Sequence, residues 1–70
     1  MPLSARNQFA GTVTRIKKGV VTADVIVALA GGNEIASVIT LESAKNLGLK
    51  KGSKVKAIIK ATDVMIAVDR

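Results

Sequence analysis

The stretch EIASVITLESAKNLG, residues 34–48, contains the change of period that decides the fold. Its first half is rich in β-branched residues, which predicts a strand. From Leu41 onward the apolar residues fall at helical spacing, with Thr40 as the N-cap, Glu42 in the first turn and Gly48 as the stop. The stretch therefore predicts a strand that leads directly into one short helix of about two turns.

Strands are expected on both sides of this stretch. Alternation and β-branched content predict two strands before it, and turn residues separate them. Two further strands are predicted after the helix. The expected strands are FAGTVTRIK (9–17), VVTADVIVAL (20–29), EIASVIT (34–40), KVKAIIKAT (54–62) and VMIAVD (64–69), with turns at KKG (17–19), AGGN (30–33) and KKGS (50–53).

The order of these elements indicates the fold class. A helix between the third and fourth of five short strands is typical of an OB-like Greek-key barrel, which removes most free sheet edges. We therefore expect an all-β protein with one short helix, built as a five-stranded barrel. The sequence contains no internal repeat, linker or low-complexity segment, so residues 1–70 are expected to form a single domain.

The composition points to assembly with other chains. A domain of 70 residues buries little apolar surface, and its stability usually needs a disulfide, a metal or a partner chain. The chain has no Cys and no His, which excludes disulfides and ordinary zinc sites. The hydrophobic fraction of 49% is high for a small monomer. We therefore expect an obligate homo-oligomer.

Charge and hydropathy restrict the partners. Neither a secretion signal nor an apolar run long enough to cross a membrane is present, so a cytoplasmic protein without membrane contact is expected. The formal charge of +6 favours an anionic partner. One Phe, with no Tyr or Trp, leaves almost no ring on which bases could stack, which argues against single-stranded nucleic acid.

The candidate site residues are hydrogen-bond donors rather than catalytic groups. Without His or Cys, the serines have no partner that would activate them, and the five carboxylates form no recognisable acid and base pair. We therefore expect no enzymatic activity. Side-chain donors remain at three places: before the first expected strand, at the start of the helix, and near the end of the fourth expected strand. At the start of the helix, free backbone N–H groups are additional donors. The side-chain donors are Arg6 with Ser4, Thr40 with Ser43, and Lys60, although each is also an ordinary residue for a tail, a cap or an exposed strand end.

Six segments together resemble one known family. They are SARNQ (4–8), GTV (11–13), KKGVVTADV (17–25), AGGN (30–33), SVIT (37–40) and IIKATDVMIA (58–67). These segments are similar to those of the molbindins, small molybdate-binding proteins built from one Mop domain. The resemblance runs over nearly the whole chain, and its most specific parts are the SARNQ opening and the KATDVMIA ending.

The resemblance implies a function and a site. Molbindins are OB-like subunits that assemble as hexamers, as trimers of dimers, and hold molybdate or tungstate at subunit interfaces for molybdenum storage and homeostasis inside the cell. By motif match, the oxyanion would be held through its oxygens, with no metal ligand and no other cofactor. The implied binding residues are Ser4, Arg6, Thr40, Ser43, Lys60 and the backbone of Ala61, where some relatives carry Ser.

The chemistry of this residue set agrees with such a ligand. Molybdate is a tetrahedral dianion without a proton at neutral pH, so its site needs donors and cations and no nearby acceptor. Phosphate keeps a proton part of the time and would gain from an acceptor. We therefore expect binding of molybdate and tungstate with little selectivity between them, weak binding of phosphate, and discrimination against sulfate only through cavity size.

Two alternatives remain at this point. The charge and the barrel-like order are also compatible with a basic OB-fold module that binds nucleic acid, although the missing aromatic residues count against it. A purely structural assembly domain would use its lysines only for solvation, and it would bind no small anion saturably.

Overall fold

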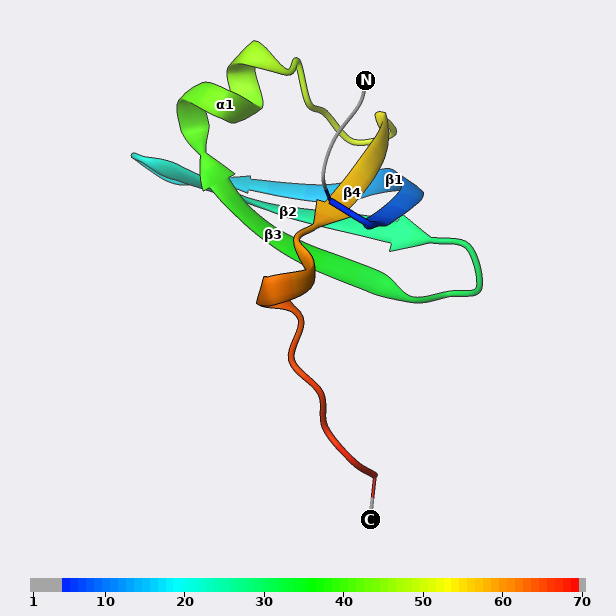
Figure 1. Cartoon of the computed structure of the whole chain (residues 1–70). Helices are drawn as coiled ribbons and strands as arrows, with labels where there is room; N and C mark the ends of the chain where they lie inside the picture. The colour runs from blue at the N-terminus through cyan, green and yellow to red at the C-terminus, as the bar shows by residue number, and fades with distance from the viewer. Residues whose placement is uncertain (1–4, 70) are drawn as a thin grey trace.

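The computed structural model describes residues 5–69 and contains one antiparallel sheet with a short helix at its side (Figure 1). The four strands have the spatial order β3-β2-β1-β4. A 3-10 turn, η1, follows the last strand. The bounds are β1 Asn7–Lys18, β2 Thr22–Leu29, β3 Glu34–Thr40, α1 Leu41–Asn46, β4 Lys54–Ile59 and η1 Ala61–Asp63.

The long strand β1 belongs to both halves of the sheet. Its first part, Asn7–Thr12, pairs with β4, and its later part, from Gly11 to Lys18, pairs with β2. The register shifts between Val13 and Arg15, which is a β-bulge. Bulges bend a strand and increase its twist. The sheet therefore curls into a half-barrel around β1 (Figure 1).

Gly11 lies where β1 changes partners. A Cβ atom at this position would come within 2.6 Å of Val27 Cγ1 and 2.7 Å of the Ala28 carbonyl oxygen. Side-chain carbon atoms do not approach backbone oxygens so closely without displacing them. The close approach of β1 and β2 at this point therefore requires glycine.

The core lies on the concave face of the half-barrel. Val13, Val25 and Val27 are buried there, and partly buried residues from all four strands and the loop after α1 pack around them. Ala23 and Ala44 are also buried. In β2 every second residue from Ala23 to Val27 is buried, as expected of a strand with one face on the core, whereas Val21 is exposed in the turn before β2.

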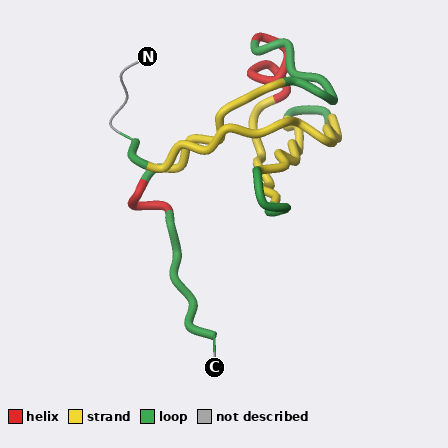
Figure 2. Tube along the Cα trace, turned by 90° about the vertical axis from the view of Figure 1, so that its right-hand side faces the viewer, coloured by secondary structure: helices red, strands yellow, loops and turns green. Residues whose placement is uncertain are grey.

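The structure confirms a mostly β domain with one short helix, but the expected count of five strands is wrong. The segment VMIAVD, residues 64–69, forms no strand and runs away from the sheet (Figure 2). A strand exists only where another strand pairs with its backbone, and within residues 5–69 none lies beside this segment. The described part of the chain is therefore a four-stranded half-barrel and not a closed five-stranded barrel.

Among residues 5–69, none of the helices has the length and apolar character needed to span a membrane.

Candidate functional site

Arg6, Lys60 and Ala61 lie together at one end of the sheet. Arg6 directly precedes β1, and Lys60 directly follows β4. The two strands are paired at this end, with Asn7 opposite Ile59, and Asn7 Nδ2 donates a hydrogen bond of 3.2 Å to the Ile59 carbonyl oxygen. This arrangement places a guanidinium and an ammonium group on neighbouring chain segments. We call Arg6, Lys60 and Ala61 the cationic half-site. The predicted residue Ser4 lies outside the described residues.

Thr40 and Ser43 lie together at the junction of β3 and α1. Thr40 has an extended backbone and caps the helix, because its Oγ1 accepts a 3.0 Å hydrogen bond from the Ser43 N–H group. The same hydroxyl donates to Ser43 Oγ at 2.8 Å. The Leu41 N–H group donates to the Val21 carbonyl oxygen at 2.8 Å, which fixes the start of the helix on the turn between β1 and β2. We call Thr40 and Ser43 the hydroxyl half-site.

The two half-sites lie at opposite ends of β1. Thr40 pairs with Thr22, beside the Lys18 end of β1, whereas Arg6 precedes its first residue, Asn7. The twelve residues of β1 therefore lie between the two half-sites. Figure 2 shows η1 and α1 at opposite sides of the molecule. One chain therefore does not bring the five described residues of the predicted set into a single site.

All five described site residues are exposed in the isolated chain. Exposed charges and hydroxyls interact weakly with a small anion, because water screens the charges and competes for the hydrogen bonds. Strong binding of a small anion requires that these charges and hydroxyls be partly removed from water. A second chain placed over either half-site would provide this.

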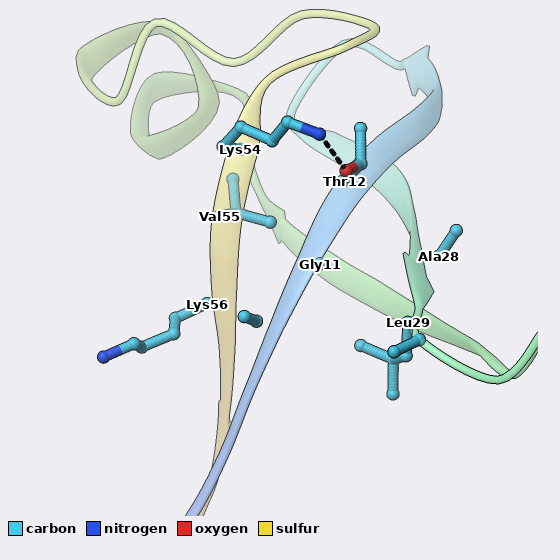
Figure 3. Close-up of a pocket in the computed structure, with 9 residues that line it drawn as sticks. Gly11, Thr12, Ala28, Leu29, Lys54, Val55 and Lys56 are labelled. Carbon is cyan, nitrogen blue, oxygen red and sulfur yellow. Dashed lines mark hydrogen bonds between the residues drawn. The ribbon is translucent and has the colours of Figure 1, made fainter.

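A separate groove lies on β1 between β2 and β4 (Figure 3). Its lining includes Gly11, Leu29 and Val55, and contains none of the predicted site residues. Its polar feature is a hydrogen bond of 3.0 Å from Lys54 Nζ to Thr12 Oγ1. The sequence contained no local pattern for this pair, because the partners are 42 residues apart.

Comparison with known proteins gives consistent results. The TOBE domain model matches residues 3–66. The chain is 54% identical to molybdenum-pterin-binding protein 1 of Clostridium pasteurianum over 66 residues, which are 94% of this chain and 97% of the relative. It is 45% identical to a probable molybdenum-pterin-binding protein of Haemophilus influenzae, over 99% of this chain and all of that protein.

Solved structures of similar proteins have the same fold. A molybdate-binding protein from Sporomusa ovata superposes with a TM-score of 0.92 at 37% identity, covering 97% of this chain and 100% of that one. MopII from Clostridium pasteurianum superposes with a TM-score of 0.91 at 52% identity, covering 96% and 100%. The cytoplasmic molybdate-binding protein ModG, with molybdate bound, gives 0.85 at 51% identity, and the match covers 87% of this chain and 43% of ModG.

These matches extend over nearly the whole chain and include both its opening and its ending. They confirm the resemblance drawn from the six sequence segments. The chain belongs to the TOBE domain family and, within it, to the molybdenum-pterin-binding proteins known as molbindins.

Proposed function

We propose that this protein binds molybdate or tungstate at interfaces between copies of its chain, and that it stores and buffers molybdenum in the cytoplasm. The observation that carries the proposal is the division of the predicted binding residues into two half-sites at opposite ends of β1. A complete site then needs the cationic half-site of one copy and the hydroxyl half-site of another. The relatives named for molybdate binding support the choice of ligand.

The donors of the two half-sites are complementary in chemistry. The cationic half-site supplies a guanidinium, an ammonium and the backbone N–H of Ala61, and we expect Ser4 to add a hydroxyl. The hydroxyl half-site supplies Thr40 and Ser43, which share one internal hydrogen bond. While that bond persists, only one of the two O–H protons is available to an outside acceptor. A proton-free dianion can accept from every free N–H and O–H group of this set, whereas the set contains no carboxylate that would accept the proton of a protonated phosphate.

The assembly we propose is a homo-oligomer, a hexamer built as a trimer of dimers, without nucleic acid or membrane as a partner. Large apolar side chains are exposed on the isolated chain, and Val20, Val38 and Leu47 are among them. They lie on different elements, so one interface would not cover them all. Contact with more than one neighbouring copy would remove this surface from water. The similar protein ModG is described as cytoplasmic, which supports the proposed location.

A calorimetric titration of anion-free protein tests the function. We expect saturable binding of molybdate and tungstate, much weaker binding of sulfate and negligible binding of phosphate. The mass of the oligomer should be measured on the same sample. An assembled protein that gives no heat with molybdate, and no competition by tungstate, would contradict the proposed function.

A further inference from the structure

Asn7 is not one of the predicted binding residues, but it lies next to the cationic half-site. It is the first residue of β1 and pairs with Ile59, the last residue of β4. Arg6 and Lys60 are each one position beyond this pair, and both are exposed. Asn7 is half-buried, and its Nδ2 donates a hydrogen bond of 3.2 Å to the Ile59 carbonyl oxygen. This bond therefore joins the two chain segments at the point where both reach the cationic half-site.

The hydrogen bond from Asn7 holds the peptide unit that leads into Lys60. The Ile59 carbonyl and the Lys60 N–H group belong to one planar peptide unit, so a bond that fixes the oxygen also fixes the plane. The next peptide unit, which contains the Ala61 N–H group, is held as well, because the Lys60 carbonyl oxygen accepts a 2.9 Å hydrogen bond from the Asp63 N–H group. Both peptide units that flank the Lys60 Cα are therefore held by the fold.

The chemistry of an amide side chain suits this position. A carbonyl oxygen can only accept a hydrogen bond, so the partner of Ile59 has to donate one. Asn supplies the donor without a charge, whereas Asp would place a carboxylate beside two cations and compete with an anion for them. An apolar side chain would leave the half-buried carbonyl of Ile59 without this bond.

We propose that Asn7 is a positioning residue for the anion site. Its hydrogen bond holds Lys60 and Ala61 beside Arg6, so that the ammonium, the backbone N–H and the guanidinium bind one oxyanion. Asn7 acts through its neighbours and is not itself a ligand of the anion. The inference rests on the proposed function and deepens it, since it assigns a role to a residue outside the predicted binding set.

A double-mutant cycle in molybdate titrations tests this role. The proteins are the wild type, Asn7→Ala, Lys60→Ala and the double variant, and the oligomer mass is measured for each. Loss of one neutral hydrogen bond that orders a binding group should weaken molybdate binding roughly 5-fold when Lys60 is present. In the Lys60→Ala background the same substitution should weaken binding less than about 2-fold, because the cation that Asn7 positions is absent.

A matched control separates positioning from a general loss of stability. Thr14 lies on the same strand and is also half-buried, and its Oγ1 donates to the Ile26 carbonyl oxygen of β2 at 3.4 Å. Thr14→Val removes this bond, which joins β1 to β2 instead of β4. It should leave the molybdate affinity unchanged within about 2-fold, whatever its effect on the midpoint of urea denaturation.

The cycle has a clear opposite outcome. Equal losses of affinity in the two backgrounds would mean that Asn7 only stabilises the fold, and they would overturn the proposed role, as would an unchanged affinity of Asn7→Ala. Asn7→Leu, which also lacks the donor but fills the position, takes the place of Asn7→Ala if the alanine variant does not assemble. The proposed function is tested separately by the wild-type protein, because a wild type that binds no molybdate would contradict that function whatever the variants do.

Discussion

The proposed division of the site between chains predicts complementation between two defective variants. Lys60→Ala removes the ammonium group of the cationic half-site, and Ser43→Ala removes a hydroxyl of the other half-site. Each substitution deletes one hydrogen bond to an anion, worth about 1.5–3 kcal/mol, so each pure variant should bind molybdate roughly 10- to 100-fold more weakly. Both residues are exposed, and neither belongs to the core.

Mixed oligomers should recover intact sites. In a random mixture of equal amounts, the cationic half of a site comes from a Ser43→Ala chain half of the time, and the hydroxyl half comes from a Lys60→Ala chain half of the time. About one quarter of the sites then contain two unaltered halves. If one chain formed the whole site, every site would carry one defect and none would recover.

The assay is a molybdate titration of co-expressed oligomers in which the two chains carry different tags and are purified over both. Native mass measurement establishes that mixed oligomers are present. The titration should show a tight phase with about one quarter of the wild-type capacity, and a co-expressed pair of differently tagged Lys60→Ala chains should show none. Verified mixed oligomers without a tight phase would refute the two-chain site.

Three further outcomes are expected. Arg6→Ala should weaken molybdate binding by about 10- to 100-fold with the oligomer mass unchanged, whereas Lys51→Ala, in the loop before β4, should not alter the affinity in the same titration. Gly11→Ala should lower the free energy of unfolding by about 1–3 kcal/mol in urea denaturation, because its Cβ would meet Val27 and the Ala28 carbonyl at 2.6 and 2.7 Å; an unchanged midpoint would contradict the close approach. Thr40→Ala should cost about 1 kcal/mol through loss of the cap, and Thr40→Ser should restore most of it in the same denaturation experiment.

Local features of the fold could be predicted from the sequence. Thr40 caps α1 as expected, and Gly48 follows the helix with a φ of 64°, a conformation that glycine adopts readily. The four paired strands overlap the expected ranges because alternation and turn residues are local signals. The fifth strand was predicted from an equally good local pattern, but a strand also needs a neighbour, and in the described part of the chain no strand pairs with residues 64–69.

The arrangement of the candidate site could not be predicted from the sequence, because it depends on contacts between residues that are far apart in the chain. The types of donor were identified in the sequence, since an oxyanion needs cations, hydroxyls and N–H groups. Their separation follows from the pairing of Asn7 with Ile59 and of Thr22 with Thr40. These pairings are between distant residues, and only the folded sheet places them. The expectation of an interfacial site came from the family resemblance and stays a prediction.

Because each chain has one half-site at each end of β1, the number of complete anion sites in an assembly would depend on the number of its chains. Every copy brings one half of each kind, so a closed ring or cage leaves no half without its complement. The number of complete sites then equals the number of chains, whatever the size of the assembly. An open chain of copies would always end in two unmatched halves, and bound anion would favour closure over continued growth. A cell could therefore adjust its molybdate reserve simply through the amount of this protein that it makes.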